Sequence, residues 1–217
     1  MSVNHIFIFT NDYDKAAQEL IDFGFTEGSN RVHPGQGTQN RKFNFNNFFL
    51  EILWVHDESE INNARTKPTK LNERANWKNN GCSPFGLCLD YSSQEDNLFE
   101  NHFKYEPAYL PQGMQIQVLR NEDNPTLPWT FRWKMPKMEP SSTQKSSEPL
   151  KHQNKIKSLS KVIFGVKQLQ SNYVQSFEND EGVFFELWEK PYLTLEFDHK
   201  KSKQVKIFDT IALTIEY

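Results

Sequence analysis

The chain has 217 residues and a formal net charge of -3, and hydrophobic residues make up 36% of it. This length is typical of one domain or of two closely packed halves. The hydrophobic fraction is modest, but 18 Phe, 7 Tyr and 5 Trp can bury enough area to supply a core. The slightly acidic balance argues against a nucleic-acid-binding protein, which would carry a basic stripe. No apolar run approaches the roughly 20 residues that are needed to span a membrane.

The two cysteines and the N-terminus indicate where the protein resides. Cys82 and Cys88 are separated by a predicted strand, so a disulfide between them would require the chain to double back. Free thiols in a reducing compartment fit this spacing better. The first residues lead directly into a predicted strand, without the basic region or cleavage site of a targeting segment. We therefore expect a cytoplasmic protein.

The N-terminal quarter of the chain combines strands with one helix. Strands are predicted at residues 3–9, 43–45 and 48–55. Residues 11–24 are typical of a helix, because Asn11 or Asp12 can cap its start and Gly24 can end it. The apolar residues of this segment recur at helical spacing, so the helix should cover one face of the sheet.

The rest of the chain is predicted to be rich in strands. Further strands are predicted at residues 85–89, 114–119, 129–133, 161–166, 183–188, 192–197 and 204–217, and a short helix at 172–177. Residues 56–81 are polar and are expected to form a loop, and residues 137–155 are the best linker candidate. Because the two ends of the chain share an order of strands and one helix, we expect a duplicated module.

A polar loop that runs into an apolar strand is the most informative local feature. Residues 32–41 hold a proline, two glycines and several hydrogen-bonding side chains, as ligand loops on a rigid sheet do. The following strand carries one carboxylate, Glu51, which is costly to bury unless it pairs, protonates or coordinates an ion. Strand alternation gives His5 and Glu51 each a defined face. If the two faces line one curved sheet, these side chains converge inside an aromatic cup.

These features, taken in order, resemble a known family. His5 on a first strand, a helix ending at Gly24, the loop from His33 to Arg41 and the strand with Glu51 resemble one βαβββ module of the vicinal oxygen chelate superfamily. The loop and the later Ser-Pro-Phe-Gly-Leu-Cys-Leu segment are similar to a glyoxalase-like branch of that superfamily.

The resemblance implies an α+β fold in which βαβββ modules form curved, mostly antiparallel sheets around a cup-shaped cavity. It implies a single glyoxalase-like unit over residues 1–217. Within it we expect an N-terminal βαβββ module at 1–55, middle strands and a polar linker at 56–155, and a C-terminal βαβββ-like module at 156–217.

In this family reading His5 and Glu51 are the catalytic pair and the ligands of one divalent metal ion, which would act as a Lewis acid. The structural alternative is that they hydrogen-bond each other or a water in the floor of a pocket. A catalytic divalent site needs about three protein ligands, and the superfamily draws the others from the second module. Aligning the C-terminal module with the first places Lys161 at the His5 position and Thr214 at the Glu51 position, and neither completes such a site.

The loop supports ligand binding without any metal. His33, Gln36, Thr38, Asn40 and Arg41 are its candidate ligand-binding residues, with Arg41 as a fork for a carboxylate or phosphate. Its glycines would let backbone amides approach the ligand. The alternative is a tight connection held by its own hydrogen bonds, in which Arg41 pairs with a structural acid such as Glu51.

Two functions of different class follow. The first is an enzyme, a lyase, isomerase or dioxygenase, acting on a small oxygen-rich or carbonyl-containing molecule. The second is a non-catalytic protein that binds or sequesters a small molecule and has a degenerate metal site; a scaffold with a vestigial pocket is a third. The expected partner is a small-molecule ligand, with no nucleic acid and no membrane, and a homodimer is compatible with the sequence.

Overall fold

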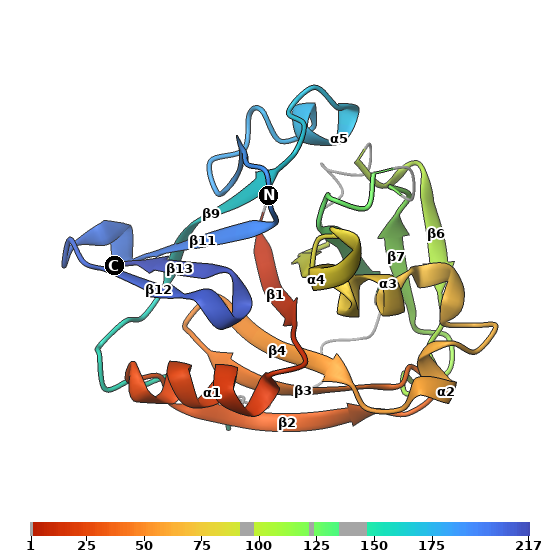
Figure 1. The fold of residues 1–217 in the computed structure, drawn as a ribbon, viewed down its shortest axis with the longest axis horizontal. Helices are drawn as coiled ribbons and strands as arrows, with labels where there is room; N and C mark the ends of the chain where they lie inside the picture. Colours follow the sequence, from red (N-terminus) through yellow and green to blue (C-terminus); the bar gives the residue numbers. More distant parts are fainter. Residues whose placement is uncertain (1, 92–97, 122–123, 135–146) are drawn as a thin grey trace.

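The protein is a mixed α+β structure built on two sheets (Figure 1). The computed structural model describes residues 2–91, 98–121, 124–134 and 147–217. Within them lie a mostly antiparallel eight-stranded sheet, a mixed five-stranded sheet with equal numbers of parallel and antiparallel pairs, and few helices. This confirms the expected fold class.

The elements have the following bounds. The eight-stranded sheet contains β1 (Val3–Phe9), β2 (Glu27–His33), β3 (Thr38–Asn44), β4 (Phe49–Val55), β5 (Phe85–Leu89), β6 (His102–Tyr105), β7 (Gln115–Leu119) and β8 (Trp129–Lys134). The five-stranded sheet contains β9 (Leu159–Val166), β10 (Val183–Leu187), β11 (Tyr192–Phe197), β12 (Val205–Phe208) and β13 (Leu213–Glu216). The helices are α1 (Tyr13–Asp22), α2 (Glu58–Ile61), α3 (Leu71–Ala75), α4 (Trp77–Asn80) and α5 (Asn172–Gln175).

The eight-stranded sheet consists of two halves with the same internal order. Its strands follow the order β2-β3-β4-β1-β5-β8-β7-β6. In the first half β1 runs parallel to β4, and in the second half β5 runs parallel to β8. The halves join through the antiparallel pair of β1 and β5. The sheet is therefore a duplicated unit with β1 and β5 at its centre.

This strand order corrects the expected pairing of modules. We expected residues 156–217 to be the partner of the N-terminal module, but the partner strands β5 to β8 come from the segment 56–155. The second half is hard to recognise in the sequence because β6 has only four residues and irregular chain separates its strands. Residues 156–217 instead form the separate five-stranded sheet. The proposed linker lies partly outside the described residues, since 135–146 are not described.

The polar segment 56–81 also differs from its expectation as a loop. It contains α2, α3, α4 and a 3-10 turn at Lys67–Thr69. The side chain of Asp57 caps α2 by accepting from the backbone N–H groups of Ser59 and Glu60. These helices are too short to be stable alone. Leu71 and Ala75 of α3 are buried in the same hydrophobic cluster as β1 and β8, so tertiary packing holds the segment in place.

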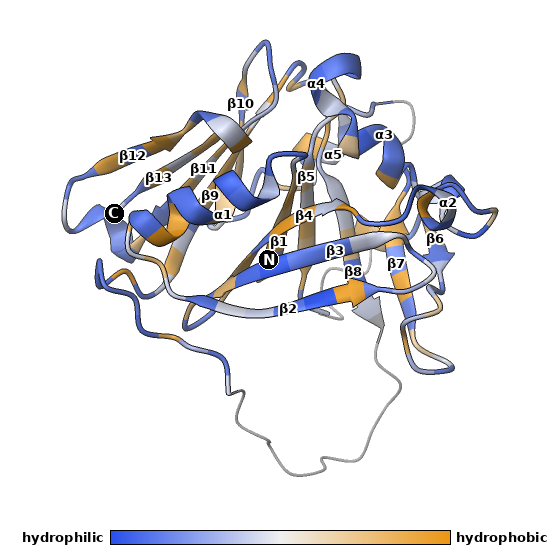
Figure 2. Ribbon diagram, turned by 60° about the horizontal axis from the view of Figure 1, so that its bottom comes forward, coloured by the Kyte–Doolittle hydropathy of each residue, from blue (hydrophilic) through white to orange (hydrophobic). Residues whose placement is uncertain are grey.

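The core lies between the two sheets. Buried residues of β1, β4, α1 and the five-stranded sheet belong to one hydrophobic cluster, in which Leu20 of α1 and Phe197 of β11 are fully buried. The edge strand β2 is mostly exposed and largely hydrophilic, whereas β4 is buried over most of its length (Figure 2). In the described part of the chain, no helix is both long and apolar enough to cross a membrane.

Phe197→Ala tests this shared core. The ring of Phe197 lies 4.7 Å from that of Phe45 and 6.3 Å from those of Phe25 and Phe48, measured between centroids. We expect the variant to lower the free energy of unfolding by about 3–5 kcal/mol in a denaturant titration. The matched control is Phe184→Ala on β10, where the ring is 36% exposed and the loss should be about 0.5 kcal/mol or less. A loss in Phe197→Ala as small as that in the control would show that the C-terminal sheet does not share the core.

Candidate functional site

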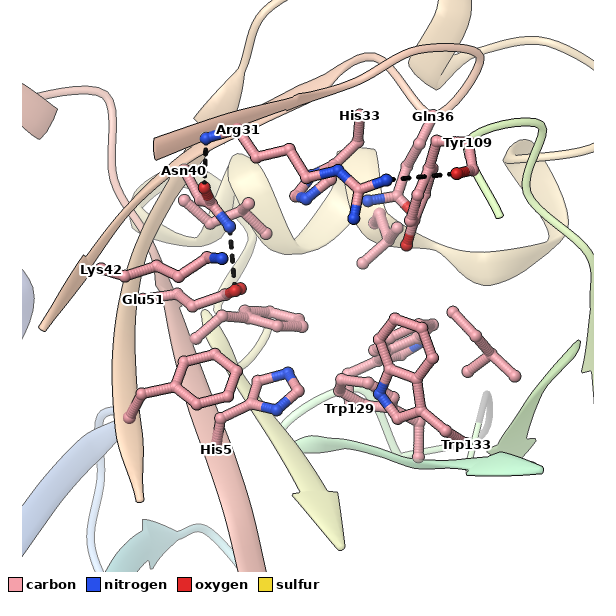
Figure 3. A pocket seen from close by; sticks show the side chains of 16 residues that line it. His5, Arg31, His33, Gln36, Asn40, Lys42, Glu51, Tyr109, Trp129 and Trp133 are labelled. Atoms are coloured by element: carbon pink, nitrogen blue, oxygen red, sulfur yellow. Dashed lines mark hydrogen bonds between the residues drawn. The ribbon is translucent and has the colours of Figure 1, made fainter. Parts of the chain in front are cut away.

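A cavity of about 200 Å³ opens on one face of the eight-stranded sheet, and both halves of the sheet line it (Figure 3). The first half supplies its polar side. Five of the residues singled out in the sequence line it: His5, His33, Gln36, Asn40 and Glu51. Thr38 and Arg41 do not. The structure therefore brings most of the predicted side chains together in one place.

Glu51 is the buried carboxyl of this cavity. It is 8% exposed and accepts a hydrogen bond of 2.8 Å from Nδ2 of Asn40. Asn40 is itself held in place, because its Oδ1 accepts from the backbone N–H of Arg31 at 2.8 Å. Burial raises the pKa of Glu51 from 4.5 to about 7, although Lys42, the Asn40 hydrogen bond and Arg31 act in the opposite direction. Near neutral pH this carboxyl exists in both protonation states.

His5 has a fixed orientation. Its ring stacks on Phe49 at 4.3 Å between centroids, and its Nδ1 lies 2.8 Å from Oδ1 of Asn4. Since Nδ2 of Asn4 donates to Asp90, Oδ1 is the atom that accepts from His5, so Nδ1 carries the proton and Nε2 is left as an acceptor. Burial, with smaller contributions from Lys42 and His33, lowers the pKa of His5 to about 3. His5 is therefore neutral at physiological pH.

His33 and Gln36 are held by Thr38, which is fully buried behind them. Oγ1 of Thr38 lies 2.9 Å from Nδ1 of His33 and accepts from Nε2 of Gln36 at 2.7 Å. Burial, followed by the charges of Arg31 and Lys42, lowers the pKa of His33 to about 4. Thr38 thus orients two cavity residues and does not itself reach the ligand space.

Two cations stand on the same side of the cavity, and sequence reasoning missed both. The guanidinium of Arg31 lies 5.1 Å from the ring centre of Tyr109 and donates to its backbone oxygen at 3.2 Å. Lys42 lies opposite Glu51 in the β3–β4 register, and Figure 3 shows its amino group beside the Glu51 carboxyl. Strand parity could have found Lys42, because it follows Asn40 by two residues on β3. The cations favour an anionic ligand.

Aromatic rings from the second half form the opposite wall. Trp129, Phe131 and Trp133 alternate along β8 and all line the cavity. The rings of Trp129 and Phe131 lie 4.7 Å apart, and His5 meets Phe131 edge-on at 5.4 Å. The strand predicted at residues 129–133 therefore supplies one wall of the cavity.

The side chains present do not fit the divalent metal site of the family reading. The strands of the second half that correspond to β1 and β4 are β5 and β8. On β5, Gly86 and Cys88 pair with Phe7 and His5, and β8 contributes only aromatic rings to the cavity. Burial raises the pKa of Cys88 far above its usual range. Among the described residues no three His, Cys, Asp or Glu side chains are grouped to hold an ion, so His5 and Glu51 lack a third ligand.

The expectation for Arg41 also needs correction. Because side chains alternate along β3, Arg41 points to the face opposite Asn40 and Lys42. There it makes two hydrogen bonds of 2.6 Å to Glu27 and one of 3.1 Å to Asp14. Arg41 is a structural ion-pair partner, as the alternative reading held, but its acid is Glu27 and not Glu51.

The backbone of the loop serves the fold in the same way. The amide of Gly35 donates to Glu60 at 2.8 Å, and the amide of Gly37 donates to the backbone oxygen of His33. Gly37 has φ of 75°, and a Cβ at this position would collide with the backbone of Asp57. These glycines are needed for a tight turn against α2, so the expected approach of their amides to a ligand does not occur.

Arg31 and Arg41 form a matched pair for mutation to lysine. Arg41→Lys keeps the charge but loses the bidentate contact to Glu27, so we expect a loss of up to about 1 kcal/mol in unfolding free energy and no change in ligand binding. Arg31→Lys should do the reverse and weaken binding of small carboxylates at unchanged stability. Denaturant titration and calorimetric binding measure the two effects. A selective loss of binding in Arg41→Lys would restore it as the anion anchor.

Comparison with known proteins identifies the family. A family model described as a glyoxalase-like domain matches residues 3–176. A hypothetical protein from Staphylococcus aureus has a similar structure, with 15% identity, 99% of this chain and 98% of that chain covered, and a TM-score of 0.61. A hypothetical protein from Bacillus halodurans C-125 matches 64% of this chain and 97% of its own at 15% identity and a TM-score of 0.41. No curated protein matches the sequence.

At such identities the Staphylococcus aureus structure supports the fold alone. The family model carries the stronger statement, because it spans both halves of the eight-stranded sheet and continues into the five-stranded one. The matched span includes His5, the polar loop and Glu51. The chain therefore belongs to the glyoxalase-like domain family.

Proposed function

We propose that the protein is an enzyme of isomerase type that removes a proton from a carbon next to the carbonyl group of a small oxo-carboxylate. The observation that carries the proposal is Glu51, a buried carboxyl whose pKa is raised to about 7, in a cavity with two cations. A general base works best when its pKa lies near the working pH. A strongly perturbed carboxyl in a cleft is also a typical sign of a functional site.

Each bond change has a group to support it. The Glu51 carboxylate takes the proton as the C–H bond breaks, and the electron pair moves onto the carbonyl oxygen to give an enolate. Lys42, beside Glu51, can neutralise that oxygen. Glu51 then returns the proton to the same carbon. Where that carbon carries a hydroxyl group, Glu51 can instead deliver the proton to the former carbonyl carbon, as the hydroxyl proton moves to the original carbonyl oxygen and a new carbonyl group forms. Asn40 holds the carboxylate in position throughout.

The remaining groups bind and orient the substrate. Arg31 offers a planar fork for the substrate carboxylate. Neutral His5 presents Nε2 as an acceptor for a substrate hydroxyl group. The rings of Trp129 and Trp133 exclude water from the opposite side and strengthen the charge interactions.

Binding without chemistry is the second candidate function. The observation that favours it is the incomplete ligand set, since His5 and Glu51 have no third metal ligand among the described residues. Arg31, Lys42 and the aromatic wall would bind an anion equally well with no reaction. In that case the cavity would capture small carboxylates and leave their C–H bonds intact.

Deuterium exchange separates these two functions. In D₂O the protein should catalyse loss of the methyl proton signal of pyruvate or the methylene signal of 2-oxobutyrate, followed by ¹H NMR. Glu51→Gln should slow this exchange by about 10²–10⁴-fold, while the control Glu27→Gln, a carboxyl outside the cavity, should leave it unchanged. The rate should rise with pH through about 7 as Glu51 ionises.

A chelator should not affect the exchange, because no step depends on a metal. Saturable binding of these acids with no exchange by the wild-type protein would establish the binding function in place of the enzyme. Exchange that is lost on chelation and restored by a divalent ion would instead establish the metal-dependent reading of His5 and Glu51.

The raised pKa of Glu51 also predicts a pH-dependent stability. Between pH 4.5 and 7 the carboxyl is protonated in the folded protein and ionised in the unfolded one, so its contribution to stability falls as pH rises. Gln has no such titration. The stability of Glu51→Gln relative to wild type should therefore increase over this window, by on the order of 3 kcal/mol.

Unfolding free energies at several pH values measure this difference. The depressed pKa values of His5 and His33 act in the opposite direction, giving stability that is lost as pH falls below 6.5. Both histidines are present in both proteins, so the comparison removes their contribution. A difference that stays constant from pH 4.5 to 7 would show that Glu51 is an ordinary carboxyl.

A further inference from the structure

A second cavity, of about 190 Å³, lies between α3 and the ends of strands β6, β7 and β8. We call it the Arg74 cavity. Its lining includes Lys70, Arg74, Cys82, Phe103, Leu119 and Trp129. It takes no part in the function proposed above, and among the described residues only Trp129 lines both cavities.

Arg74 is a buried cation without a buried acid. It is 3% exposed, and its Nη1 donates to the backbone oxygens of Ser83 at 3.0 Å and Leu127 at 2.8 Å. No carboxylate among the described residues lies within ion-pair distance of it. Burial lowers the pKa of Arg74 only to about 10, so it is charged at neutral pH. Its Nε is buried without a hydrogen-bond partner.

Trp129 also carries a buried hydrogen-bond donor without a partner. Its indole Nε1 is buried and also lacks a partner, although the side chain is only 4% exposed. Buried donors are nearly always satisfied in proteins, and each exception calls for an explanation such as a bound ion or molecule. Two side chains that line this cavity, one of them with an uncompensated charge, therefore each carry a buried N–H group without a hydrogen-bond partner.

The carbonyl groups that accept from Arg74 lower the cost of its burial but leave its charge uncompensated. The ion pair of Lys70 with Glu73 at 3.1 Å is already made on the exposed side. Elsewhere Phe103 and Leu119 make the lining apolar. The lining thus combines the guanidinium of Arg74 and the indole N–H of Trp129 with the Lys70–Glu73 ion pair and an apolar wall.

We propose that the Arg74 cavity binds a small organic monocarboxylate. The carboxylate pairs with the guanidinium of Arg74 and accepts from Nε1 of Trp129, and the apolar part packs against Phe103 and Leu119. Trp129 also lines the first cavity, which holds Glu51, so a ligand at either site lies next to this side chain.

Chemical shifts of the side-chain N–H groups test this binding. In ¹⁵N-labelled protein, benzoate should shift the Nε–H signal of Arg74 and the Nε1–H signal of Trp129 to saturation. The neutral isostere benzamide and inorganic phosphate should not. The Arg74 signal decides, because a ligand in the other cavity could also move Trp129. No Arg74 shift with benzoate, or an equal one with benzamide or phosphate, would overturn the proposal.

A cavity-filling variant avoids the risk that replacing Arg74 prevents folding. Leu119→Phe should weaken the benzoate response at Arg74 by about tenfold or more, while the same change at exposed Leu150 should leave it unaltered. Undiminished binding in Leu119→Phe would place benzoate elsewhere. The response should persist in Glu51→Gln, so this site can fail or hold independently of the proposed enzyme activity.

Discussion

The antiparallel pairing of β1 with β5 is the contact on which the rest of the structure depends. It joins the two halves of the eight-stranded sheet and places β4 and β8 on either side of the centre. Gly86 permits this pairing, because a Cβ there would collide with the ring of Phe7. The space that a side chain on β5 would take is occupied by Phe7, which packs on Trp129 and Phe131. The same contact that builds the sheet thus removes a position from which the second half could supply a polar ligand.

The cavity that results is chemically one-sided. One wall carries a titratable carboxyl, two neutral histidines and two cations, and the other wall is aromatic. Burial alone would raise the pKa of Glu51 further, and the charges of Lys42 and Arg31 limit that rise. Burial lowers the pKa of both histidines, with Lys42 adding to the effect at each and Arg31 at His33, so His5 and His33 are neutral. Glu51 is then the group of this wall that titrates near neutral pH, which is why we assign the base to it and not to a histidine.

Much of this could be predicted from the sequence, and the failures have physical reasons. Helix α1 and strands β1 and β4 were predicted because their periodicity and caps are strong, and strand parity also indicated the cavity-facing sides of His5 and Glu51. Strand β2 was missed because an exposed edge strand has no apolar alternation. The short helices between β4 and β5 depend on tertiary contacts of residues such as Leu71. Arg41 was assigned to the ligand because a forked cation near a loop fits an anion site, but its parity on β3 points it to Glu27.

The pairing of modules was the most consequential error, because it decided where to seek the missing metal ligands. The C-terminal sheet offered Lys161 and Thr214, and the true second half offers Gly86 and Phe131 in the corresponding strands. Neither segment supplies the missing metal ligands. Only the true second half shows which residues stand at the corresponding positions. A divalent ion would bring two positive charges to a developing enolate oxygen, and Lys42 and Arg31 bring the same number to the edge of the cavity. On the proposed mechanism the aromatic second half is then not a vestige: by excluding water it increases the effect of those two charges on the reacting oxygen.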